Sequence, residues 1–86
     1  MANHKSAIKR ARQSEEQRVR NRSRKTRMKN VLRKLEETIS SKSREAASED
    51  LKQAVSVISK TAAKGVIHKN TASRKISRLT RRVNAL

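Results

Sequence analysis

The stretch that decides the fold is Met28-Lys-Asn-Val-Leu-Arg-Lys-Leu-Glu-Glu-Thr-Ile39. Its apolar residues recur every three or four positions, which places them on one face of an α-helix. They are Met28, Leu32, Leu35 and Ile39, with Val31 alongside. The stretch therefore predicts a helix that buries one side against other helices.

Two similar stripes follow along the chain. The second comprises Ala47, Leu51, Ala54, Val55, Ile58 and Ala62, and the third comprises Ala72, Ile76, Leu79, Val83 and Leu86. Three helices with one apolar face each predict an all-α, three-helix bundle. The chain has 86 residues and no aromatic side chain, so we expect a small aliphatic core and weak intrinsic stability.

Two breaks divide the helices. The polar run Ser40–Ser43 predicts a turn, with Ser43 as an N-cap and Glu45 in the first turn of the next helix. Gly65, the single glycine, suits the left-handed residue that ends a helix. Asn70 or a near neighbour would then cap the third helix. We predict one domain over residues 1–86, with helices at about 5–41, 44–64 and 68–85.

The first helix begins well before its apolar stripe. The residues before Met28 include only Ile8 and Val19 as larger apolar side chains, yet nothing there breaks a helix. This half cannot be buried in a core, so we predict that it projects beyond the bundle. At about 1.5 Å per residue, the whole helix would be roughly 55 Å long.

Positive charge is concentrated at the two ends of the chain. The net charge is +17, from 24 Lys and Arg against 7 Asp and Glu. Residues 1–27 carry ten basic and two acidic side chains, and residues 66–86 carry six basic and none acidic. A charged surface that only faces water would need neither such an excess of positive charge nor its concentration at the two ends of the chain. The balance indicates a polyanionic partner.

On the first helix the charge faces two directions. At about 100° per residue, Arg18, Arg22 and Lys25 share one face, and Arg20, Arg24 and Arg27 share the opposite face. We infer that this segment lies between two stretches of nucleic-acid backbone. The third helix differs, because its basic residues form a single stripe beside its apolar face. They are Arg74, Lys75, Arg78, Arg81 and Arg82.

The lack of aromatic residues argues against a surface that stacks single-stranded bases. The expected target is structured, largely helical nucleic acid that is bound through its backbone, with salt-dependent affinity. Asn21, Ser23 and Thr26 could add hydrogen bonds to phosphates or 2′-hydroxyls. Composition alone does not separate RNA from DNA.

Three alternatives compete with this interpretation. Residues 21–27 followed by a leucine stripe are similar to a basic-region leucine zipper, but the stripe is shorter than a zipper needs. A membrane-surface helix would need a bulky apolar face that the N-terminal segment lacks. A polyamine-like cation without a specific fold is the third. No apolar run is long enough to span a membrane or to form the core of a signal peptide.

Nothing in the sequence favours catalysis. His4 and His68 are the only imidazoles and lie far apart, and there is no cysteine to hold a metal or a disulfide. Glu36 and Glu37 are adjacent, so their side chains would diverge on a helix and would not form a pair of catalytic carboxylates. We expect them to be surface charges near Arg33 and Lys34. His68 is interpreted equally well as a loop residue or as an RNA contact. We expect no enzyme activity, metal site or cofactor.

Several segments closely resemble the bacterial small-subunit ribosomal protein twenty family. The matching segments are Met1-Ala-Asn-His-Lys-Ser-Ala-Ile-Lys-Arg10, Arg20-Asn-Arg-Ser-Arg-Lys-Thr-Arg-Met28, Ala62-Ala-Lys-Gly-Val-Ile-His-Lys-Asn70 and Ala72-Ser-Arg-Lys-Ile-Ser-Arg-Leu79. The resemblance covers essentially the whole chain and is weakest over residues 36–56. It implies a bundle with an extended first helix, in a cytoplasmic ribosome or an organellar ribosome of bacterial type.

The resemblance also implies a role and a set of contacts. It implies direct binding to small-subunit ribosomal RNA, between the 5′ domain and the 3′ minor domain, early in assembly, by a monomer close to other small-subunit components. The implied RNA contacts are Lys5, Lys9, Arg10, Arg12, the basic residues from Arg18 to Arg27, Lys64, His68, Lys69, Asn70, Arg74, Lys75 and Arg78.

Overall fold

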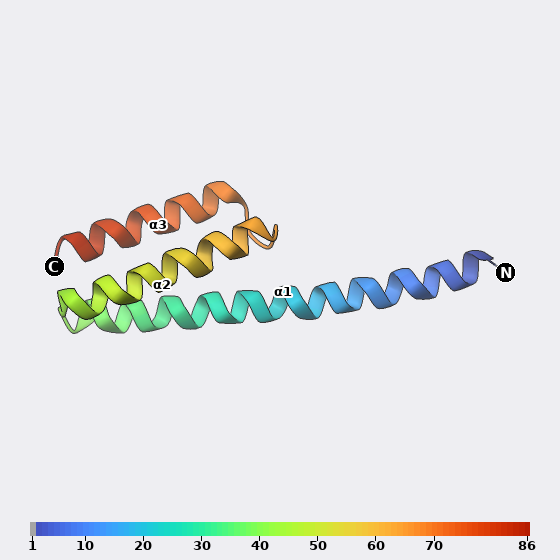
Figure 1. Cartoon of the computed structure of the whole chain (residues 1–86), viewed down its shortest axis with the longest axis horizontal. Helices are drawn as coiled ribbons and strands as arrows, with labels where there is room; N and C mark the ends of the chain where they lie inside the picture. The colour runs from blue at the N-terminus through green and yellow to red at the C-terminus, as the bar shows by residue number, and fades with distance from the viewer. Residues whose placement is uncertain (1) are drawn as a thin grey trace.

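The computed structural model describes residues 2–86, and their side chains from His4 onward. It contains α1 (Ala2–Ser40), α2 (Arg44–Ala63) and α3 (Lys69–Asn84), with no strand in the described part (Figure 1). α2 runs back along the second half of α1, and α3 runs back along α2 (Figure 1). The predicted all-α bundle with a long first helix is confirmed. α1 begins at Ala2, ahead of the expected start near Lys5.

α1 is one uninterrupted helix of 39 residues, which corresponds to about 58 Å. It sets the longest dimension of the molecule, 63 Å. Only its second half is covered by α2, and its first half extends past the bundle (Figure 1). We take residues 2–20 as this projecting segment and call them the arm. Every side chain from His4 to Arg20 is exposed, in agreement with the scarcity of apolar residues there.

α2 lies between α1 and α3 and packs against both. The buried apolar residues are Met28, Leu35, Ala47, Ala54, Val57, Ile58, Ala72, Leu79 and Val83. A helix with neighbours on two sides needs a wider apolar face than one stripe provides, which explains why adjacent Val57 and Ile58 are both buried. Val57 lies outside the predicted stripe, whereas Val55, which lies in it, is only half-buried.

The α1–α2 turn uses a left-handed residue. Lys42 has φ of 59°, and its N–H donates to the Ile39 carbonyl at 3.0 Å. Ser43 occupies the N-cap position of α2 in extended backbone, but its hydroxyl makes no capping hydrogen bond. The prediction for Ser43 was therefore correct in position only.

The α2–α3 connection is fixed at both ends. Gly65 has φ of +77°, its N–H donates to Ala62, and the N–H of Val66 donates to Thr61, which together form a Schellman motif. The prediction for Gly65 is confirmed. His68 is the N-cap of α3, and its Nδ1 accepts a hydrogen bond from the N–H of Asn70 at 3.1 Å.

Polar contacts join the helices at the end where α1 meets α2. The Asp50 carboxylate is hydrogen-bonded to the Thr38 hydroxyl and lies 3.6 Å from Lys34 Nζ. Glu36 does not pair with Arg33 or Lys34 as expected. It pairs with Arg82 of α3 instead, because antiparallel packing returns the last turn of α3 to the last turns of α1.

Candidate nucleic-acid interface

The arm exposes a dense set of cations on a helical support. Its basic residues are Lys5, Lys9, Arg10, Arg12, Arg18 and Arg20. The large apolar side chains of Ile8 and Val19 are about half exposed, at 51% and 55%, so they contribute no core there. The arm can therefore offer its cations to a partner on more than one side.

Arg18 already has a partner within the arm. Its Nη2 lies 2.6 Å from Oε1 of Glu15 and its Nε donates to Oε2 at 3.1 Å. The hydrogen bonds from Arg18 lower the pKa of Glu15, and the same contact raises that of Arg18. Both side chains are well exposed, so the pair is weak enough for a phosphate to replace the carboxylate.

The structure places the two predicted basic faces of α1 differently with respect to the bundle. Arg24 is half-buried, donates to Asn21 at 3.2 Å, and faces α2 together with Arg27. On the other side, Arg18, Arg22 and Lys25 lie along a shallow surface with Asn21, Thr26 and Lys29. Ser23 lines a shallow groove with Arg22 and Arg27. Arg20 lies on the arm and donates to Gln17 at 3.2 Å.

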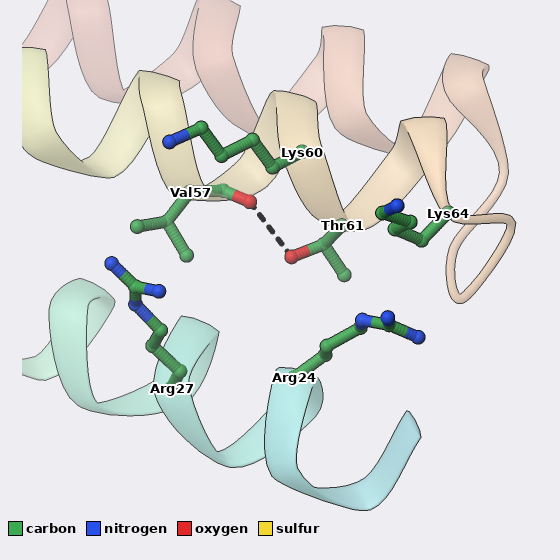
Figure 2. A pocket seen from close by; sticks show the side chains of 6 residues that line it. All are labelled: Arg24, Arg27, Val57, Lys60, Thr61 and Lys64. Carbon is green, nitrogen blue, oxygen red and sulfur yellow. Dashed lines mark hydrogen bonds between the residues drawn. The ribbon is translucent and has the colours of Figure 1, made fainter. Parts of the chain in front are cut away.

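A cleft of about 180 Å³ lies between α1 and α2, near the place where the arm joins the bundle. It is lined by Arg24, Arg27, Val57, Lys60, Thr61 and Lys64 (Figure 2). The Thr61 hydroxyl donates to the Val57 carbonyl at 2.7 Å, so this buried polar group is satisfied within α2. Three of these four cations, Arg24, Arg27 and Lys64, are among the RNA contacts predicted from the sequence. Lys60 is not, although its spacing of four from Lys64 indicates that both share one face.

α3 has the arrangement that its sequence predicts. Ala72, Leu79 and Val83 are buried on one side. The predicted contacts Lys69, Asn70, Arg74, Arg78 and Arg81 are exposed, and Lys75 is half-buried. Arg82 is also exposed, but its guanidinium is already held by Glu36. His68, for which the sequence left a loop residue and an RNA contact as alternatives, contributes its ring to the cap of α3.

The acidic residues lie mainly at the opposite end from the arm. Five of the seven lie in the last turns of α1 or the first turns of α2, and they are Glu36, Glu37, Glu45, Glu49 and Asp50. The molecule is therefore electrically polarised, with a mixed-charge end where α1 turns into α2 and a basic end formed by the arm, the cleft and the α2–α3 connection.

Neither a metal site nor a membrane-spanning helix is found among the described residues. No group of His, Cys, Asp or Glu there could hold a metal ion. None of the described helices is long and apolar enough to cross a membrane.

Comparison with known proteins gives one consistent family. A family model described as Ribosomal protein S20 matches residues 2–84. The small ribosomal subunit protein bS20 of Syntrophobacter fumaroxidans is 74% identical over 86 residues, with both chains covered in full. The bS20 proteins of Desulfotalea psychrophila and Desulfatibacillum aliphaticivorans are 60% and 54% identical over 86 residues, covering this chain in full and 97% and 98% of theirs. With matches along the whole chain, this protein belongs to the ribosomal protein S20 family.

Proposed function

We propose that the protein binds small-subunit ribosomal RNA directly and holds RNA of the 5′ domain against RNA of the 3′ minor domain during assembly. The observation that carries this proposal is the polarised charge on a continuous helix: an exposed basic arm continues directly into a bundle that bears a second basic surface on α3. Family membership supports the ribosomal target.

The mechanism follows from electrostatics and rigidity. Two RNA backbones resist close approach because their phosphates repel, and cations placed between them remove that repulsion. A loose polycation would do this without preferring any geometry. Here the bundle fixes the angle between α1 and α3, so binding favours one tertiary arrangement of the RNA. The role is structural rather than catalytic.

The proposed contact set extends over the arm, the junction and α3. It comprises Lys5, Lys9, Arg10, Arg12, Arg18, Arg20, Asn21, Arg22, Ser23, Arg24, Lys25, Arg27, Lys64, His68, Lys69, Asn70, Arg74, Lys75, Arg78, Arg81 and Arg82. Arg18 and Arg82 are already paired with Glu15 and Glu36. To bind RNA, each either exchanges its carboxylate for a phosphate or keeps the carboxylate and lies beside the RNA without bonding to it.

The partners follow from the same proposal. The protein acts as a monomer on the cytoplasmic ribosome, next to other small-subunit components. The zipper alternative loses its basis, because Met28 and Leu35 of its leucine stripe are buried in the bundle core rather than exposed as a dimer seam.

Chemical footprinting of small-subunit ribosomal RNA, with and without the protein, tests the proposal. Protection on both the 5′ and the 3′ side is expected, whereas protection on one side alone would reject the bridge. Binding at several salt concentrations should give a slope of log K against log salt of roughly −5 to −9, for about six to ten phosphate contacts.

Matched triple variants test the two faces of α1. Arg20, Arg24 and Arg27 changed to Gln, or Arg18, Arg22 and Lys25 changed to Gln, should each weaken binding, because Gln keeps helix propensity while removing charge. Changing Lys42, Arg44 and Lys52 to Gln at the mixed-charge end removes the same charge and should have a much smaller effect. An unchanged affinity in either of the first two variants would reject the two-sided contact.

A further inference from the structure

The cleft between α1 and α2 brings cations from two helices together. Arg24 and Arg27 line it from α1, Lys60 lines it from α2, and Lys64 lines it from the position just after α2 (Figure 2). The Val57 side chain and the buried Thr61 lie at its base. The pairing depends on tertiary packing, because Arg24 and Lys60 are 36 positions apart in the sequence.

No acidic side chain lines this cleft. Among the described residues, Arg24 hydrogen-bonds to the neutral amide of Asn21, and no ion pair involves Arg27, Lys60 or Lys64. Elsewhere, cations that face a neighbouring helix are paired with carboxylates: Lys34 pairs with Asp50, and Arg82 pairs with Glu36. Like charges that line one cleft repel, so an anion bound among them would relieve repulsion between α1 and α2.

The location of the cleft suits an extended polyanion. The cleft lies near the inner corner formed where the arm leaves the bundle beside the α2–α3 connection (Figure 1). Arg20 precedes Arg24 by four residues, which places it on the same side of α1. A nucleic-acid backbone that follows the arm would thus reach the cleft at the end of its path.

We propose that the cleft receives a backbone phosphate of RNA, held by Arg24, Arg27, Lys60 and Lys64. The inference deepens the proposed function and rests on it. It adds Lys60, on α2, to the RNA-binding residues. It also gives the contact a second effect, because a phosphate bridging α1 and α2 would hold the two helices together where the arm leaves the bundle. Guanidinium groups supply paired donors and the lysines supply point charges to the same group.

Binding of Lys60→Gln to small-subunit ribosomal RNA is the first test. Affinity should fall about tenfold, as for the loss of one charge-assisted hydrogen bond. The slope of log K against log salt should become shallower by about 0.7 to 0.9. Lys52→Gln is the matched control: it is a highly exposed lysine of α2 outside the cleft and should leave both quantities unchanged.

A second measurement uses the unmodified chain, so it does not depend on a variant folding. Lysines are acetylated in the free protein and in its RNA complex, and the sites are quantified by mass spectrometry. Lys60 and Lys64 should react several-fold more slowly in the complex, while Lys52 reacts at an unchanged rate. Equal reactivity of Lys60 in both states would overturn the proposal. Protection of Lys60 that requires other ribosomal proteins would also overturn it, since the occupant would then be another anion.

The two levels of the proposal fail differently. If the protein does not bind the RNA, the unmodified chain gives no complex and the proposed function fails. If the unmodified chain binds, while Lys60→Gln matches it in affinity and salt slope, only the cleft assignment fails.

Discussion

The guanidinium of Arg82 and the carboxylate of Glu36 form a two-point ion pair, with Nη1 at 2.5 Å from Oε1 and Nη2 at 2.8 Å from Oε2. The residues are 46 positions apart and join α3 to α1 directly. α2 separates these helices along most of their length, so the pair fastens the bundle at the end away from the arm.

This ion pair should make stability depend on acid pH. The hydrogen bonds from Arg82 lower the pKa of Glu36 from its ordinary value of 4.5. A carboxyl whose pKa is lower in the folded state contributes stability above the unfolded value and loses it as pH falls through the folded value. Glu36→Gln should therefore reduce the free energy of unfolding by about 0.5 kcal/mol at pH 7, with a smaller difference in acid. Urea denaturation at pH 7 and at pH values below 4.5 measures the free energy of unfolding of each variant, with Glu37→Gln as the charge-matched control. Equal losses in the two variants at pH 7 would contradict the assignment.

Leu35 should be critical to the small core. It is 0% exposed and is one of the two largest fully buried side chains. Leu35→Ala should cost about 3 kcal/mol of unfolding free energy, because it removes buried surface and leaves a cavity. Ile8→Ala on the arm also shortens an aliphatic side chain and should change stability by less than about 0.5 kcal/mol. Thermal unfolding followed by circular dichroism compares them, and similar midpoints for both variants would place the core elsewhere.

Replacing Lys42 should separate backbone strain from charge. Lys42 has φ of 59°, a conformation that costs an L-residue about 1 kcal/mol and costs glycine little. Lys42→Gly should therefore be about 1 kcal/mol more stable than Lys42→Ala, although both remove the same charge. Chemical denaturation of the two variants is the measurement. An alanine variant as stable as the glycine variant would mean that the turn adopts another backbone conformation.

The arm should open more easily than the rest of α1 in the free protein. Its side chains make no core contact, and its excess of positive charge destabilises an isolated helix. Amide hydrogen exchange should show low protection for residues 5–20 and high protection around Met28, Leu35 and Ile58. Binding of ribosomal RNA should raise protection in the arm. Uniform protection along α1 without RNA would contradict this prediction.

The sequence predicted the features that depend on one helix at a time. The three apolar stripes, the projecting first half of α1 and the left-handed Gly65 follow from local spacing and from the absence of helix breakers. His68 as the cap of α3 was within the expected range but was not singled out, because Asn is the commoner cap residue.

The features that were missed depend on which helices are neighbours. A helical wheel of α2 alone gives one apolar stripe, and the burial of Val57 and Thr61 follows only once α2 is known to lie between two helices. The Glu36–Arg82 pair and the placement of Lys60 and Arg24 along one cleft have the same origin. Opposed faces on α1 were predicted from angles, but which of them would turn toward α2 was not.

The continuity of α1 makes the arm and the bundle share one helical phase. One extra residue inserted in the arm would rotate all preceding side chains by about 100° and advance them by about 1.5 Å. In the proposed complex, the basic side chains of the arm would then point away from the phosphates that they are proposed to contact, although composition and net charge would barely change. An insertion in the α1–α2 turn would leave that phase intact. The number of residues between the arm and the bundle therefore sets the direction in which the side chains of the arm point. We expect length changes to be tolerated at residues 41–43, and to weaken RNA binding when they fall between the arm and Arg24.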